Sequence, residues 1–163
     1  TDENQMTADS IRMLITNKTI DRIFLIDNSF VVAQDSLSHF NQIKGRKMTA
    51  FFKEKAINHV DVDGNGESVY FALQETKNEA APDSLGMAKP TVVMMGMNKI
   101  ICSNMKINFK AGKVNNISFY VQPDASFIPP SELEEGEKKL RGFTWRIGEK
   151  PEKSDVVKSK KDL

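Results

Sequence analysis

The sequence is poor in the residues that mark many metal sites and redox proteins. It has one cysteine and two histidines among 163 residues. A single cysteine, Cys102, excludes an internal disulfide and any Cys-x-x-Cys site. His39 and His59 lie far apart with no third ligand patterned beside either of them, which argues against a zinc site. We therefore expect no metal cofactor, and we expect both histidines on the surface or at strand edges.

An excess of one charge and long apolar runs are also lacking. The 23 basic residues are balanced by 22 acidic residues, and the net charge of +1 does not point to nucleic acid. The longest weakly polar run, Pro90 to Met97, is far too short to span a membrane as a helix. The chain begins at Thr1 rather than at a methionine, which fits either a shortened chain or a mature exported protein.

Catalytic motifs are missing as well. There is no Gly-x-Ser-x-Gly, no phosphate-binding glycine loop and no carboxylate pair in an apolar context, so we expect neither enzyme activity nor a cofactor. Cys102 alternates with Ile100, as a small buried strand residue does. The series Asp61, Asp63, Asn65 resembles the start of a calcium loop, but its twelfth position is Ala72 instead of glutamate. A turn is the better interpretation of this stretch.

What the sequence does contain is a strand–turn–strand pattern that occurs three times. Apolar and polar residues alternate on both sides of a short polar turn, and shifts of 37 and 57 residues superimpose the copies. Each copy has an apolar face that it cannot bury alone, which predicts stacked hairpins. The coinciding apolar positions are Ile11, Met48 and Met105; Met13, Ala50 and Ile107; Ile15, Phe52 and Phe109; Ile20, Ile57 and Val114; Ile23, Val60 and Ile117; and Leu25, Val62 and Phe119.

The remaining patterns predict a single all-β domain over residues 1–147. Residues 1–7 are expected to be a ragged terminus, and Asn28-Ser29 is expected to join two strands. Asp63-Gly64-Asn65-Gly66 predicts a hairpin turn, because glycine and asparagine tolerate positive φ. The expected strands and units are Asp9–Thr16, Thr19–Asp27, Phe30–Gln34, a further short strand at Leu37–Ile43, Lys44–Leu73, Thr91–Asn108, Lys113–Val121 and Ala125–Ile128.

Three further segments are predicted to differ from this pattern. Residues 74–89 are polar and too long for a hairpin loop, which indicates either a mobile insertion or an extended connection. Ser131 to Arg141 is predicted to be a short helix, with Ser131 as N-cap, glutamates in the first turn and basic residues in the last. Residues 148–163 are rich in lysine and predict a disordered tail.

Four stretches, in this order, resemble the OstA-like proteins of Bacteroidetes-type bacteria, which are related to the LptA lipopolysaccharide-transport family. They are IKGRKMTAFF at 43–52, INHVDVDGNGESVY at 57–70, GMNKIICSN at 96–104 and LRGFTW at 140–145. The resemblance covers roughly residues 8–147, and its most specific part is VDVDGNG with the downstream SVY. Segment 74–89 and the predicted helix depart from the family pattern, and the helix would cap an end of the domain.

The resemblance implies a β-jelly roll folded like a taco, without catalytic residues, in the periplasm and associated with the outer membrane. The implied ligand is lipopolysaccharide, bound through its lipid A acyl chains. The implied partners are other jelly-roll transport proteins and further copies of the chain, joined by edge-strand pairing. The positions that match the family's inward, lipid-binding face are Ile11, Met13, Ile15, Ile23, Leu25, Met48, Ala50, Phe52, Val60, Val62, Met105, Ile107, Phe109, Ile117 and Phe119.

Two other functions stay open at this point. A structural β-module with a filled core and no lipid could bind partner proteins by adding an edge strand. A hydrolase or carbohydrate-binding jelly roll would need exposed aromatic residues and converging carboxylates. The same alternation serves a dry core or a groove, and the eight methionines suit either ordinary core filling or a pliable apolar surface.

Overall fold

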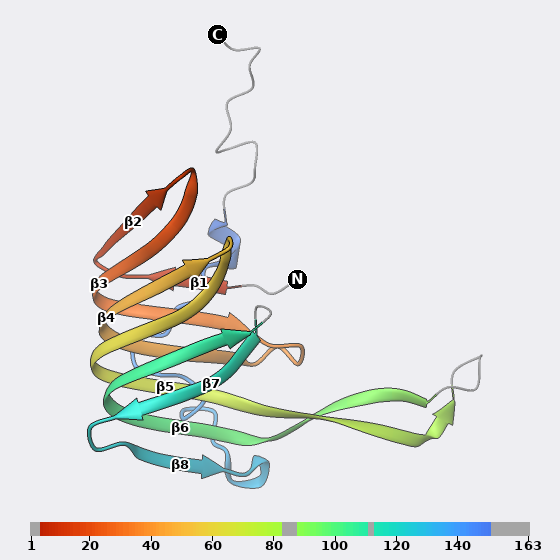
Figure 1. Ribbon diagram of the computed structural model, residues 1–163. Helices are drawn as coiled ribbons and strands as arrows, with labels where there is room; N and C mark the ends of the chain where they lie inside the picture. The colour runs from red at the N-terminus through yellow and green to blue at the C-terminus, as the bar shows by residue number, and fades with distance from the viewer. Residues whose placement is uncertain (1–3, 83–87, 111–112, 151–163) are drawn as a thin grey trace.

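The protein is a single antiparallel sheet of eight strands, seen in a computed structural model that describes residues 4–82, 88–110 and 113–150 (Figure 1). The predicted all-β, jelly-roll-like fold is confirmed. The strand order is β1-β3-β4-β5-β6-β7, with β2 also paired to β3 and β8 to β6. The strands are β1 (Asn4–Thr7), β2 (Ser10–Thr16), β3 (Thr19–Gln34), β4 (Phe40–Lys53), β5 (Ala56–Pro82), β6 (Ala88–Lys110), β7 (Lys113–Tyr120) and β8 (Asp124–Ile128).

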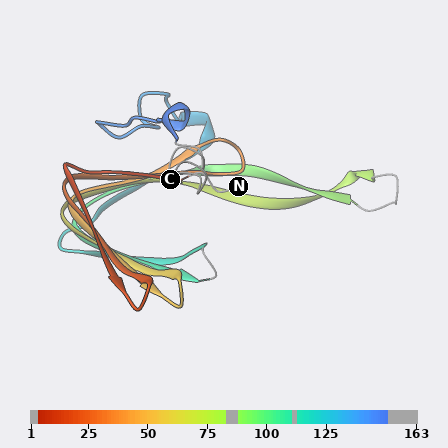
Figure 2. The same cartoon turned by 90° about the horizontal axis from the view of Figure 1, so that it is seen from above.

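The sheet bends along one line and forms two half-sheets that diverge from it (Figure 2). The first half-sheet contains β2, β7 and residues 19–26, 47–53, 56–63 and 104–110 of the four long strands. The second contains β1, β8 and residues 29–34, 40–45, 66–74 and 94–102. β3, β4, β5 and β6 run through both half-sheets. We call the line between them the crease.

At the crease each register breaks, and in β3 and β5 the backbone enters the left-handed region. In β3 the bend lies at Asp27 and Asn28, with φ of 56° and 48°, and in β5 at Gly64 and Asn65, with φ of 76° and 53°. The prediction of a hairpin turn over Asp63–Gly66 is therefore wrong. β5 pairs with both β4 and β6 before and after this point, so the positive φ values bend the strand without reversing it. The expected join at Asn28-Ser29 is likewise a bend inside one strand.

Gly45 illustrates how tightly the crease is packed. A Cβ at this buried position would lie 2.4 Å from Val62 Cγ1, and Val62 is itself fully buried. Gly45→Ala should therefore lower the free energy of unfolding by about 1–3 kcal/mol, measured by urea denaturation. Gly136→Ala is the matched control, because nothing lies within 4 Å of a Cβ at that glycine. Equal stability of the two variants would contradict this packing.

The three predicted hairpins are present and share their register. The pairs Ile11↔Leu25, Met48↔Val62 and Met105↔Phe119 occupy the same place in each, as the repeat predicts. Every hairpin also carries a bulge at one equivalent position, where the second strand has an extra residue. These extra residues are Asp21, Asn58 and Asn115, which are 37 and 57 residues apart. The repeat therefore extends to the details of strand pairing.

Segment 74–89 lies largely within paired strand. β5 and β6 stay paired from Leu73↔Met94 to Lys77↔Pro90 and again at Pro82↔Ala88, and they project beyond the sheet as a two-stranded arm (Figure 1). Of the two predicted interpretations, an extended connection describes this segment. Residues 83–87 lie outside the described residues.

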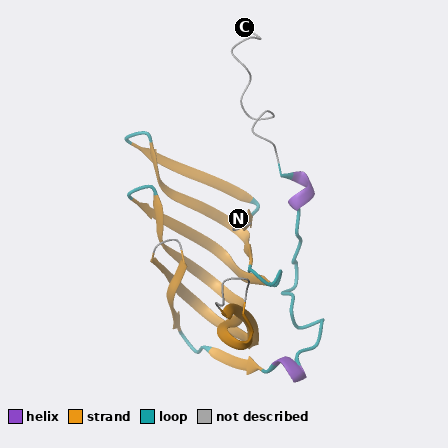
Figure 3. Cartoon of the chain, turned by 90° about the vertical axis from the view of Figure 1, so that its right-hand side faces the viewer, coloured by secondary structure: helices purple, strands orange, loops and turns teal. Residues whose placement is uncertain are grey.

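The predicted helix over Ser131–Arg141 is wrong. The described part of the chain has only two helices, both three-residue 3₁₀ turns: η1 (Pro130–Glu132) and η2 (Ile147–Glu149). Neither is long and apolar enough to cross a membrane. Residues 133–146, here called the strap, run along one side of the sheet (Figure 3). Hydrogen bonds from β1 and β4 hold the strap there. A helix over this segment would have Gly136 at its centre, and glycine in a helix interior is destabilising.

Gln42 and Gln5 bind the strap backbone. The Gln42 amide donates to the carbonyl oxygen of Lys138 and accepts from the N–H of Leu140. Gln5 does the same with Thr144 and Arg146. Because Gln5 lies in β1, the expectation of a ragged terminus over residues 1–7 is wrong for residues 4–7. The predicted tail, apart from residues 148–150, lies outside the described residues.

The protein has two hydrophobic cores, one on each face of the second half-sheet. The first lies in the angle between the half-sheets and contains Ile23, Leu25, Met48, Ala50, Val62, Cys102, Met105 and Ile107. The second lies under the strap and contains Phe30, Val32, Val69, Phe71, Met97 and Leu140, with Phe40, Phe143 and Trp145 packed against it. The second half-sheet thus carries a hydrophobic core on each face, whereas the first carries one only on its inner face.

Candidate functional site

The inner face of the first half-sheet carries apolar side chains in continuous rows across six strands. The crease row, nearest the bend, consists of paired residues from β2, β3, β4, β5, β6 and β7. The middle row follows two residues further from the bend. The crease row is Ile11, Leu25, Met48, Val62, Met105 and Phe119, and the middle row is Met13, Ile23, Ala50, Val60, Ile107 and Ile117.

A third set of apolar pairs lies at the free ends of the three hairpins, here called the lip. The pairs are Ile15↔Ile20, Phe52↔Ile57 and Phe109↔Val114. Each comes just beyond the bulge of its hairpin. The first member of each pair, Ile15, Phe52 or Phe109, follows the inner-face residues of its strand at the regular spacing of two. The lip pairs therefore complete an apolar face three residues deep along the strands.

Burial along this face falls steeply from the crease to the lip and toward the edge strand. Leu25, Met48 and Val62 are fully buried, whereas Ile20 is 37% and Ile15 60% exposed. Packing between the half-sheets explains the buried end, because Val31 and Ile43 of the second half-sheet contact the same core. Large apolar side chains are left partly in water at the other end. Soluble proteins rarely leave a continuous apolar surface of this kind without a ligand or a partner.

The wall opposite this face is only partly apolar. Its first row, nearest the crease, contains Met6, Val31, Ile43, Ser68, Ile100 and Ala125, which are paired across the second half-sheet. The next row is more polar and includes Asn41, Tyr70 and Asn98. The interior therefore has one apolar side, on the first half-sheet, and one amphipathic side.

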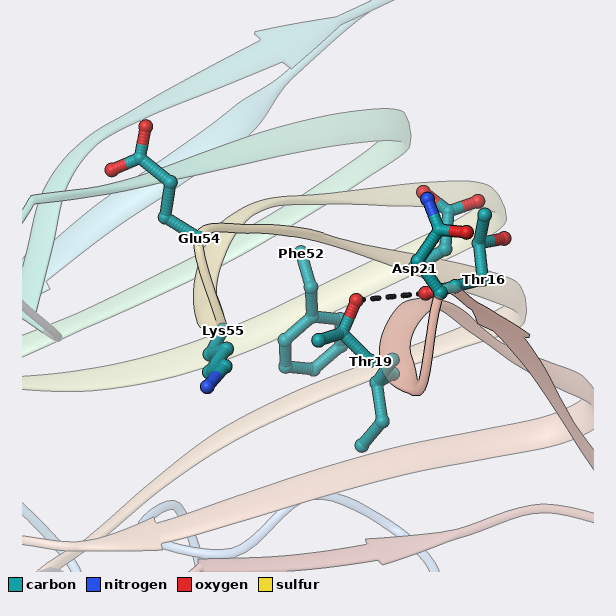
Figure 4. A pocket seen from close by; sticks show the side chains of 8 residues that line it. Thr16, Thr19, Asp21, Phe52, Glu54 and Lys55 are labelled. Atoms are coloured by element: carbon teal, nitrogen blue, oxygen red, sulfur yellow. Dashed lines mark hydrogen bonds between the residues drawn. The ribbon is translucent and has the colours of Figure 1, made fainter.

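A hollow of about 480 Å³ lies at the lip between the first two hairpins (Figure 4). Ile20 and Phe52 give it an apolar part, and Thr16, Asn17, Thr19, Asp21, Glu54 and Lys55 surround them with polar groups. The Thr19 hydroxyl donates to the Thr16 carbonyl oxygen at 2.8 Å and closes the first turn. The two turns have matching geometry, with positive φ at Asn17 and Lys18 and at Glu54 and Lys55.

All fifteen residues predicted to form the lipid-binding face lie on this one inner face, and their role in binding lipid stays a prediction. Ile20, Ile57 and Val114 belong to the same face, and the repeat already aligned them. Residues of the opposite wall, such as Met6, Val31 and Tyr70, were not predicted. Apolar and polar residues continue to alternate past each bend and could have indicated these positions. The alternation does not show which face they share with the first half-sheet until the bend is known.

The remaining chemistry-bearing residues do not assemble into another site among the described residues. Asp35 accepts hydrogen bonds from two backbone N–H groups of its own loop and contacts His39 Nδ1. His59 stacks on Phe51, with ring centroids 4.3 Å apart, on the outer face. Burial raises the pKa of the Cys102 thiol, which keeps it protonated at neutral pH. No cluster of three or more metal-binding side chains occurs in the described part of the chain.

Comparisons with family models, curated proteins and solved structures found no match. The likeness to OstA-like proteins is therefore carried by the four sequence stretches alone. The inner face is described by its own geometry: a continuous apolar surface, closed at the crease and exposed at the lip.

Proposed function

We propose that this protein is a noncatalytic lipid-binding domain that holds acyl chains on the inner face of the first half-sheet. In line with the resemblance, the ligand is lipopolysaccharide, and the domain takes part in its transport to the outer membrane through the periplasm. The observation that carries the proposal is the apolar inner face, which is buried at the crease and partly exposed at the lip.

The size of the apolar face is sufficient for useful affinity. Burial of apolar surface contributes about 25 cal/mol per Å², so about 300 Å² of acyl chain would contribute roughly 7 kcal/mol before the cost of association. Only part of this remains as net binding free energy. That magnitude suits a carrier that has to release its ligand to the next protein.

The apolar rows extend to both edge strands of the first half-sheet. Exposed edge strands at the ends of the rows support the predicted protein partners. Among the strands that the structure describes, β2 pairs only with β3, and most of its residues are exposed. β7 forms the opposite edge of the first half-sheet. A second jelly roll, or a second copy, that paired its β7-like edge with β2 would continue the crease row from Phe119 to Ile11. In this proposal, edge pairing extends the apolar face from one protein to the next.

The alternative function is a structural β-module that uses the same edge strands and binds no lipid. The buried part of the crease row favours this alternative, because Leu25, Met48 and Val62 already form a filled core. The two functions differ in the lip. A module that binds partner proteins only through its edge strands does not require contact between Phe52 and an acyl chain.

Two neighbouring phenylalanines allow a matched test. Phe52 lies on the inner face and Phe51 on the outer face, where its ring contacts His59 and Arg22. Phe52→Asp should weaken binding of fluorescent lipopolysaccharide about tenfold or more, because a carboxylate would replace apolar contact with the chain. Phe51→Asp should leave the affinity within about twofold. Circular dichroism of both variants verifies that they are folded.

Crosslinking provides a second measurement that does not depend on the aspartate variants. A photo-reactive residue at Phe119, on the inner face, should form adducts with lipopolysaccharide. The same residue at Tyr120, which is its neighbour on the opposite face, should not. Equal yields at the two positions, or equal loss of affinity in the two aspartate variants, would refute binding on the inner face and favour the edge-binding module.

A further inference from the structure

Lysines gather at the lip, where the apolar face ends. Lys18 lies in the β2–β3 turn, Lys53 is the last residue of β4, Lys55 lies in the β4–β5 turn, and Lys110 is the last residue of β6. We call these four residues the basic rim. All four are exposed, and none of them forms a salt bridge with the residues that the structure describes. The rim is thus free to meet a negative charge from outside the chain.

The lysines occupy repeated positions. Lys18 and Lys55 are 37 residues apart and hold the second place in equivalent turns, with φ of 62° and 66°. Left-handed backbone is uncommon for lysine, and glycine or asparagine would suit such a turn better. A long cationic side chain therefore stands at the same point of two neighbouring hairpins. Backbone preference does not account for its presence there.

Acidic residues near the rim are fewer and differently placed. Asp21 pairs with the Arg22 side chain at 3.2 Å. Glu54 points to the other side of its turn from Phe52, whereas the Lys55 side chain extends to the same side as the Phe52 ring (Figure 4). Glu54 and Lys55 both line the hollow that contains Phe52, with the Lys55 side chain on the side of the Phe52 ring. The lip thus joins an apolar surface to a positively charged border.

We infer that the ligand of the inner face is an anionic amphiphile whose charged headgroup lies at the basic rim while its chain lies on the apolar rows. This inference rests on the proposed lipid-binding function and adds the orientation of the ligand and the residues that meet its charge. The geometry suits it, because Phe52 at the lip and Met48 at the crease are about 13 Å apart along β4. An acyl chain that lies between these two residues places the headgroup of the ligand at the lysines.

The test compares two ligands with the same acyl chain, lysophosphatidic acid and the uncharged monoacylglycerol. The affinity of each ligand is measured by displacement of the neutral fluorescent probe N-phenyl-1-naphthylamine from the protein, at ligand concentrations below the critical micelle concentration of that ligand. The wild type should prefer the phosphate-bearing ligand at low salt. The double variant Lys18→Gln, Lys55→Gln should weaken its binding about fivefold and leave the monoacylglycerol affinity unchanged, as two surface ion pairs would. Added salt should reduce the wild-type preference.

A control variant removes the same number of charges elsewhere. Lys47 and Lys139 are exposed and lie outside the lip, so their replacement by glutamine should leave both affinities within twofold. Glu54→Gln should strengthen binding of the phosphate-bearing ligand.

The other outcomes have distinct meanings. Equal wild-type affinity for the two ligands, or an equal effect of the two double variants, would overturn the headgroup site while leaving the lipid-binding function in place. Failure of both ligands to bind would instead overturn the lipid-binding function. If the rim variant loses only its association with phosphatidylglycerol vesicles and keeps its preference for monomeric lysophosphatidic acid, the lysines meet a bilayer surface, and the headgroup site is refuted.

Discussion

Leu25→Ala should lower the free energy of unfolding by about 2–5 kcal/mol, because it removes a fully buried side chain from the centre of the crease row. Its neighbours Met48 and Val62 belong to the same core, and they are held by strands that pair on both sides. Such neighbours cannot move to fill the space left by the missing carbons. Urea denaturation followed by circular dichroism measures the effect.

Ile11→Ala is the matched control, since Ile11 pairs directly with Leu25 in the same row. Ile11 is 52% exposed on the edge strand, so its truncation should cost less than about 1 kcal/mol. The contrast tests the burial gradient along one row. Similar losses at Leu25 and Ile11 would mean that β2 is covered in the native protein, for instance by a second copy. In that case the loss at Ile11 should depend on protein concentration.

Gln42→Leu should destabilise the protein by about 2–4 kcal/mol, although leucine is apolar and similar in size. The Gln42 side chain is fully buried, donates to the carbonyl oxygens of Lys138 and Phe40 at 2.7 and 2.9 Å, and accepts from the Leu140 N–H at 2.8 Å. Leucine would leave strap backbone groups without a partner in a buried site, and each such group costs about 1–3 kcal/mol. The strap should then detach more easily from the second core.

Gln5→Leu serves as the control, because Gln5 makes the same pair of backbone hydrogen bonds at 2.8 Å in an exposed position. Water can replace these bonds, so the expected loss is less than about 1 kcal/mol. Trp145, the one tryptophan of the chain, reports on the strap, since its ring lies 5.1 Å from that of Phe40. Its fluorescence should shift in Gln42→Leu at lower urea concentration than in Gln5→Leu. A reversed order would refute the role of the buried glutamine.

The inner face was predictable because its signal is local and repeated. In a strand, neighbouring side chains point to opposite faces, so Met48, Ala50 and Phe52 share a face wherever the strand lies. Three copies with the same spacing predicted hairpins whose apolar positions coincide, and Met48↔Val62 is one of the pairs that the structure shows. The bulges at Asp21, Asn58 and Asn115 follow the same spacing, although one copy alone would not reveal them.

The helix expected near Ser131 shows where local signals failed. Its capping residues and charge distribution are those of a helix, yet the segment lies against the sheet. Gln42, more than ninety positions earlier in the sequence, supplies the hydrogen bonds that a helix would have made internally. Leu140, Phe143 and Trp145 bury apolar surface on the second core in the same step. The tertiary contacts therefore outweighed the helix propensity of this segment.

The sequence by itself determined the strands, their faces and the three hairpins, since these depend on alternation and turn residues within about twenty positions. Only the tertiary structure decided that Gly64 and Asn65 bend a strand and do not end it, because a left-handed residue permits either outcome and the pairing of β5 with β4 and β6 selects the bend. It also decided which part of the apolar face is buried. That depends on how far the second half-sheet reaches over the first, and no local pattern encodes this distance.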